Sequence, residues 1–140
     1  MNNVSNPVSL VAGAELPPLV FPVTAGAIAV AAIATNDYQN VHHDIAAAKA
    51  AGVPDIFMNI LTTNGLVQRY VNDWAGPQLR IHGIRLRLGA PNFVGDTMTF
   101  SGNVASVDAA TGRAELQVQG RNRLGEHVNA TVTVSLGEGA

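Results

Sequence analysis

The sequence contains no cysteine, which excludes a disulfide framework, a thiolate nucleophile and a zinc–cysteine site. Charge is also scarce, because Asp, Glu, Lys and Arg make up only 13% of the 140 residues, against roughly 25% in an ordinary globular domain. A chain with so little surface charge is expected to cover a further face in a subunit interface. We therefore predict an oligomer.

Basic clusters and phosphate-binding motifs are missing as well. Eight Lys and Arg oppose ten Asp and Glu, for a net charge of −2, and the basic residues are scattered. This pattern argues against a nucleic-acid or membrane partner. The sequence has no Gly-rich phosphate loop, Ser-centred elbow or Walker motif. No charge precedes Glu15 to form the basic start of a secretory signal, so we expect a cytoplasmic location.

The longest uncharged stretch, residues 16–36, is not a membrane span. Prolines interrupt it, and only residues 25–34 are continuously apolar or small, which is too short to cross a bilayer. The pattern predicts an extended segment at 19–23 and a buried Ala-rich helix over 24–35. Residues 1–15 are expected to be a flexible or extended N-terminal segment.

Two further helices follow. Asp44 is a suitable N-cap for a short helix over residues 45–51, and Gly52 with Pro54 would end it. Apolar residues then recur at helical spacing from Asn59 to about Asp73. This second stretch predicts the long helix of the domain.

After that helix the apolar residues alternate, which is typical of strands. The alternation runs over residues 81–88, 98–104, 116–118 and 128–134, with short turn-like separators. Short connections favour antiparallel neighbours. We therefore predict an α+β chain whose residues 1–140 form a single domain, with an antiparallel sheet wrapped around the long helix, the hot-dog arrangement.

A carboxylate and an imidazole, Asp37 and His42, lie five positions apart in the polar segment between the first two helices. A carboxylate that holds a water and an imidazole that exchanges protons near neutral pH are the groups needed to add water to a polarised double bond. The pair therefore suggests hydration or hydrolysis.

Simpler interpretations of this segment remain open. Both residues could merely cap a helix and hydrogen-bond a turn. The run from His42 to Asp44 could also bind a metal, but a hydrolytic zinc site needs at least three converging ligands. Since His82 and His127 fall on separate predicted strands, we expect no metal.

The residues around the pair resemble the loop of the MaoC-like hydratases, a hot-dog family in which Asp, Asn-Pro, His and Asp precede the central helix. The matching residues are Asp37, Gln39 with Asn40, His42 and Asp44. Gln39 and Asn40 depart from Asn-Pro, which alters the side-chain scaffold of the loop but leaves the Asp and the His in place. The resemblance implies an R-specific type of enoyl-CoA hydratase with Asp37 and His42 as catalytic residues.

Residues 55–62, 65–71 and 73–77 are similar to the small subunit of actinobacterial steroid side-chain hydratases. In that group the small subunit carries the catalytic residues, and a larger MaoC-like partner has a degenerate half that makes room for a steroid ring system. The resemblance implies a heterodimer or heterotetramer that hydrates a steroid-derived enoyl-CoA in cholesterol catabolism. No cofactor is implied, because coenzyme A is part of the substrate.

The start of the long helix supplies candidates for substrate binding. Its first N–H groups are unsatisfied and lie at the positive end of the helix dipole, so we predict that the N–H of Ile60 binds the thioester oxygen. The MaoC-like pattern usually has glycine there. Asn59 is expected to cap the helix or to touch the acyl group. Arg85 and Arg87 either reach the phosphates of coenzyme A or face solvent, and solvent is the simpler expectation.

Other functions compete with a catalytic hydratase subunit. A hot-dog thioesterase would have a carboxylate on or beside the long helix, where this sequence offers no acid before Asp73. A non-catalytic partner subunit would have no need to keep Asp37 and His42 together. A homomeric hydratase of fatty enoyl-CoA would need its own space for the acyl group, which the sequence does not report.

Overall fold

The computed structural model describes residues 8–137. Its elements are, in chain order, β1 (Glu15–Pro22), α1 (Ala25–Ala34), the 3₁₀ turn η1 (Asn40–His42), α2 (Ile45–Ala50), α3 (Ile60–Ala75), β2 (Leu79–Leu88), β3 (Thr97–Asp108), β4 (Arg113–Asn122) and β5 (Gly125–Leu136). All three predicted helices are present. The predicted strands are also present, and each extends beyond its alternating core.

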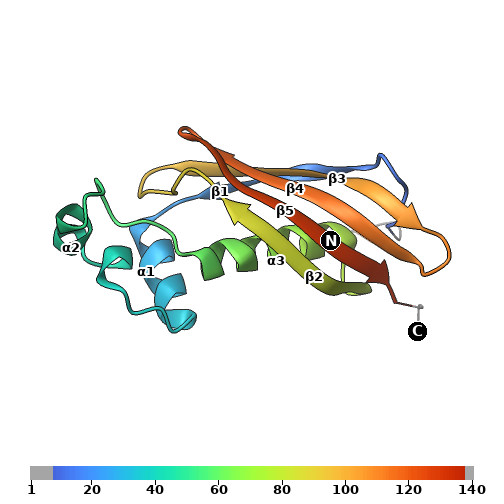
Figure 1. Cartoon of the computed structure of the whole chain (residues 1–140), viewed down its shortest axis with the longest axis horizontal. Coiled ribbons are helices and arrows are strands. Elements are labelled where there is room, and N and C mark those ends of the chain that lie inside the picture. The colour runs from blue at the N-terminus through green and yellow to red at the C-terminus, as the bar shows by residue number, and fades with distance from the viewer. Residues whose placement is uncertain (1–7, 138–140) are drawn as a thin grey trace, which may run out of the picture.

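The five strands form one antiparallel sheet in the order β1-β3-β4-β5-β2. The sheet arches over α3, while α1 and α2 lie beyond the end of the sheet at which α3 begins (Figure 1). This arrangement confirms the predicted α+β hot-dog fold. It leaves β1 and β2 as the two edges of the sheet.

The core fills the space between α3 and the concave face of the sheet. Alternate residues of β3, β4 and β5 are fully buried, as strand periodicity requires, and they meet one face of α3 that includes Leu66, Val67 and Val71. Tyr70 stacks on Phe100 with ring centroids 5.5 Å apart. Burial of these apolar side chains is the main stabilisation of the domain.

Strand β1 begins earlier than the sequence predicted, at Glu15, although it contains Pro17 and Pro18. An edge strand tolerates proline because half of its backbone groups need no ladder partner, and the register with β3 shifts between Leu16 and Leu19. Within the expected N-terminal segment, Gly13 and Ala14 already hydrogen-bond to Val104. Residues 1–7 lie outside the described residues.

Helix α1 was expected to be buried, and this is only half correct. Ile28 and Ala32 are buried, but Val30 is 66% exposed and Ile33 is 53% exposed. Because the helix lies beyond the sheet, one of its sides packs against the rest of the domain and the other side is exposed to solvent. An uncharged helix with apolar residues on all sides normally has a covering partner. None of the helices within residues 8–137 is long and apolar enough to cross a membrane.

Candidate active site

The end of α1 determines where Asp37 lies. Thr35 ends the helix, and its hydroxyl donates to the carbonyl of Ala31 at 2.8 Å. Asn36 adopts a φ of +57°, a left-handed conformation that Asn tolerates better than most residues. The N–H of Asp37 then donates to the carbonyl of Ala32 at 2.9 Å. The chain therefore turns sharply and leaves the carboxylate of Asp37 beside the start of α3.

Only one residue of the His42–Asp44 run enters the site. The carboxylate of Asp44 accepts from the N–H groups of Ala46 and Ala47 at 2.8 and 3.1 Å, so it caps α2 as predicted. His43 is exposed. Within residues 8–137, no three His, Asp or Glu side chains converge as metal ligands.

His42 is buried and held in one tautomer. Its Nδ1 lies 2.7 Å from the carbonyl oxygen of Phe57, and because a carbonyl only accepts, this nitrogen carries the hydrogen. The ring also meets the Phe57 ring edge-on at 4.9 Å. The other nitrogen, Nε2, lies 3.3 Å from Oδ2 of Asp37. The structure therefore brings the two predicted catalytic residues together.

The carboxylate of Asp37 is stabilised in its ionised form. Its Oδ2 accepts from Nδ2 of Asn59 at 2.9 Å, and its Oδ1 accepts from the N–H of Gln39 at 3.3 Å. The Asn59 hydrogen bond is the largest cause that lowers the pKa of Asp37, with smaller contributions from Gln39 and His42, while partial desolvation opposes them. The side chain is 19% exposed, so water can reach the carboxylate.

The loop holds Asp37 although Gln39 and Asn40 replace the Asn-Pro of the family pattern. The interaction with Asp37 comes from the backbone N–H of Gln39, which does not depend on the side chain. The Gln39 side chain makes no capping bond to η1. The altered scaffold is therefore compatible with the geometry of Asp37.

The start of α3 is held beside the pair by the loop between β2 and β3. The N–H of Met58 donates to the carbonyl of Asn92 at 3.0 Å, and Phe57 forms an antiparallel bridge with Phe93. Oδ1 of Asn59 accepts from the N–H of Thr62 at 2.9 Å, which confirms the predicted cap. Among the described residues, no group accepts a hydrogen bond from the N–H of Ile60. Its role as a thioester donor stays a prediction.

Three parts of the site were not visible in the sequence pattern. The carbonyl of Phe57 fixes the tautomer of His42, but any residue type supplies a carbonyl. The hydroxyl of Thr35 accepts from Nδ2 of Asn59 at 3.0 Å, and nothing in its spacing indicated this contact. Asn59 was considered as a cap or an acyl contact, and its bond to Asp37 was not anticipated.

Of the two arginines of β2, Arg85 lines a pocket of about 460 Å³ together with Ile60 and Leu61 at the start of α3. Arg85 and Arg87 are exposed on the strand face opposite Ile84 and Leu86, and the Arg85 guanidinium is 3.9 Å from the Glu115 carboxylate. The alternation predicted for this strand is thus confirmed. Contact with coenzyme A stays a prediction for both arginines.

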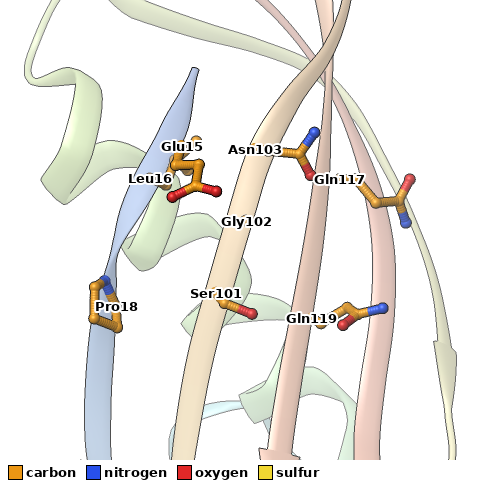
Figure 2. Close-up of a pocket in the computed structure, with 8 residues that line it drawn as sticks. All are labelled: Glu15, Leu16, Pro18, Ser101, Gly102, Asn103, Gln117 and Gln119. Carbon is orange, nitrogen blue, oxygen red and sulfur yellow. The ribbon is translucent and has the colours of Figure 1, made fainter. Parts of the chain in front are cut away.

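A hollow of about 470 Å³ lies on the outer face of the sheet, turned away from α3 (Figure 2). Its lining includes the side chains of Glu15, Ser101, Asn103, Gln117 and Gln119. Glu15 is the only ionisable residue of the lining, so this hollow has no acid–base pair.

Comparison with known proteins identifies the family. Residues 15–138 match the family model of the MaoC like domain. The chain belongs to the MaoC-like family. A MaoC-like relative from Mycobacterium tuberculosis H37Rv, the 3-oxo-4,17-pregnadiene-20-carboxyl-CoA hydratase beta subunit, is 52% identical over 126 residues, which cover 90% of this chain and 96% of the relative.

Two solved structures share the fold of this chain. The ChsH1–ChsH2 complex of Mycobacterium tuberculosis contains a chain that is 52% identical to this one, with a TM-score of 0.88 over 91% of this chain and 99% of that chain. The (R)-hydratase of A. caviae, which takes part in PHA biosynthesis, is 22% identical, with a TM-score of 0.84 over 91% of this chain and 98% of that chain. The second likeness shows the fold alone.

Proposed function

We propose that this chain is the catalytic subunit of an enoyl-CoA hydratase, which adds water across the α,β double bond of a CoA thioester. The observation that carries the proposal is the pair of Asp37 and His42, 3.3 Å apart, with the carboxylate open to water at the start of α3. The similarity to a named CoA hydratase subunit supports it.

The pair provides two acceptors for one water molecule. Nδ1 of His42 bonds to the carbonyl of Phe57, so Nε2 is the nitrogen left to exchange a proton, and in the neutral ring it accepts a hydrogen bond on the side of Asp37. One hydrogen of the water bonds to the carboxylate and the other to Nε2, which turns an oxygen lone pair towards the substrate. The oxygen bonds to the β-carbon as the double bond opens. One proton of the water passes to the pair, and a proton is delivered to the α-carbon.

The negative charge that develops on the thioester oxygen needs a donor that is already in place. The N–H of Ile60 is the first of α3 and has no acceptor among the described residues. It also lies at the positive end of the helix dipole. A backbone donor directed at the developing oxyanion stabilises the transition state more than the ground state. The reaction requires no cofactor.

A partner subunit is part of the proposal. The M. tuberculosis relative is named a beta subunit, and the solved structure that is 52% identical to this chain is a complex. In this chain the exposed residues Val30 and Ile33 of α1 and the free edge β2 are surfaces that such a MaoC-like partner would cover. We propose a heterodimer or heterotetramer acting on a steroid-derived enoyl-CoA. A cytoplasmic location stays a prediction.

The alternatives fit the structure less well. Helix α3 has no acidic residue in its first turn, which is unfavourable for a thioesterase. A non-catalytic subunit would not need a single His tautomer facing a carboxylate. A homomeric hydratase of fatty enoyl-CoA keeps the same catalytic pair and differs only in the partner and the acyl group.

The test is a hydration assay followed by mass spectrometry. The chain is assayed alone and co-purified with a larger MaoC-like partner, on 3-oxo-4,17-pregnadiene-20-carboxyl-CoA and on a short fatty enoyl-CoA. We expect hydration of the steroid thioester by the complex, with kcat falling roughly 10²–10⁴-fold in Asp37→Asn. The control is Asp73→Asn, the same change at a carboxylate that is 57% exposed on α3, which should leave kcat unchanged.

Each other outcome identifies an alternative. Activity of the chain alone on the fatty substrate indicates a homomeric hydratase. Full activity of the complex with Asp37→Asn assigns the chemistry to the partner. Release of free coenzyme A that is lost in Asp73→Asn indicates a thioesterase.

A further inference from the structure

Asn59 connects the carboxylate of Asp37 to the first turn of α3. Its side chain is buried, with the residue only 4% exposed. Nδ2 donates to Oδ2 of Asp37 at 2.9 Å and to the hydroxyl of Thr35 at 3.0 Å. Oδ1 accepts from both the N–H and the hydroxyl of Thr62. One amide thus joins the end of α1, the candidate catalytic carboxylate and the start of α3.

The orientation of this amide follows from its neighbours. The N–H of Thr62 is a donor and requires an oxygen, whereas the ionised carboxylate of Asp37 only accepts and requires an N–H. A flipped amide would place two acceptors against each other on one side and two donors on the other. The arrangement with Nδ2 on Asp37 is therefore the one that satisfies every group.

The four hydrogen bonds leave Asn59 without a free donor. An asparagine amide has two N–H donors, and both are used within the chain. Contact with a thioester oxygen would require Asn59 to release Asp37 or Thr35. This argues against the substrate-binding role that the sequence suggested for it.

We propose that Asn59 is a positioning residue, which holds the carboxylate of Asp37 at a fixed place relative to the first N–H of α3. The proposal rests on the hydratase function described above. Asn59 caps the same helix that offers the N–H of Ile60. One rigid amide therefore sets the separation between the group that holds the water and the group that receives the charge on the thioester. Pre-set geometry of this kind accounts for a large part of enzymatic rate enhancement.

The surroundings of Asp37 make its ionisation a readout of this contact. The titratable group that faces it is His42 of η1, while the end of α1 and the start of α3 contribute the uncharged Thr35 and Asn59. The bond from Asn59 is the largest cause that lowers the pKa of Asp37. Loss of this donor raises that pKa, so the acid limb of the pH–rate profile moves to higher pH.

The experiment uses the complex with its partner and two substitutions that keep the helix cap. Asn59→Asp is close to isosteric and retains a capping oxygen, but it places a second carboxylate against Asp37. Asn59→Ser also retains a cap, but its shorter side chain does not reach Asp37. In both we expect kcat to fall on the order of tenfold to a hundredfold, with KM within about threefold and the acid limb moved to higher pH, further in Asn59→Asp.

Thr62→Val is the matched control, because it removes a hydroxyl bond to Asn59 and leaves the amide on Asp37. Its acid limb should stay at the wild-type pH. A raised KM with unchanged kcat and acid limb in both Asn59 variants would overturn the proposal in favour of substrate binding. If Asp37→Asn remains fully active in the same complex, the hydratase assignment to this chain fails instead, which separates the two conclusions. Should Asn59→Ser not fold, Asn59→Asp decides alone.

Discussion

Two regions of this molecule hold a buried histidine in nearly the same way. At the site, Nδ1 of His42 lies 2.7 Å from the carbonyl of Phe57; in the core, Nδ1 of His127 lies 2.6 Å from the carbonyl of Ala90. The two histidines differ in the group that their Nε2 atom contacts. That of His42 faces the partly exposed carboxylate of Asp37, whereas that of His127 accepts from the buried hydroxyl of Thr63 at 2.8 Å.

The partner of Nε2 therefore distinguishes a histidine suited to catalysis from a structural one. His127 is 1% exposed, and burial lowers its pKa below the ordinary value of 6.5. Its neutral ring joins β5 to α3 and to the loop that follows β2, which stabilises the fold. His42 has a similar backbone anchor, but its second nitrogen meets a carboxylate that water reaches. The same substitution, His to Gln, tests this difference at three positions.

His42→Gln should have the largest effect on activity. Glutamine can still donate to the carbonyl of Phe57 but does not exchange protons near neutral pH, so kcat for hydration should fall roughly 10²–10⁴-fold. Thermal unfolding of the purified complex provides the control for folding. Retained activity in a folded variant would remove the distinction between the two histidines.

His127→Gln should affect stability rather than chemistry. The open amide side chain fills the space of the ring less completely and cannot bond both Thr63 and Ala90 in the same geometry. The free energy of unfolding should therefore fall by about 1–3 kcal/mol. Urea unfolding measures this loss. We expect kcat at saturating substrate to change less than tenfold in the folded fraction, and a loss as large as that of His42→Gln would contradict a structural role.

The pH dependence of stability should also separate the two regions. Because the pKa of His127 is lower in the folded state than in the unfolded chain, only the unfolded chain takes up this proton as the pH falls below about 6.5. Above that pH, His127 does not change the free energy of unfolding with pH. Below it, the free energy of unfolding falls by up to about 1.4 kcal/mol for each pH unit.

Urea unfolding at a series of pH values between about 7.5 and 5 measures this loss of stability. The wild-type slope should exceed that of His127→Gln. Equal slopes in the two proteins would mean that His127 protonates freely in the fold.

His43→Gln should have the smallest effect. His43 is next to His42 in the sequence, but it is exposed, and its Nε2 lies 3.4 Å from the carbonyl of Tyr38. Stability should change by no more than about 0.5 kcal/mol, and kcat should change by less than about twofold. A large loss of activity would show that the site includes both histidines.

Local patterns predicted the elements of this protein well. Alternation placed β2 to β5, and helical spacing placed α3, because each pattern reflects which side of an element is buried. The estimate for β1 was too short, since proline normally argues against a strand and only the position at the sheet edge permits it. The burial of α1 was overestimated, because sequence shows that a helix is apolar but not which chain covers it.

The sequence by itself determined the hot-dog elements and the presence of Asp37 and His42 at a spacing typical of the MaoC-like loop. Only the tertiary structure decided what acts on that pair. The carbonyl of Phe57 lies 15 residues from His42, and Asn59 lies 22 residues from Asp37. Contacts over such separations depend on how α1, η1 and α3 pack together. A backbone carbonyl, moreover, is the same in every residue type, so no spacing or composition could have revealed it.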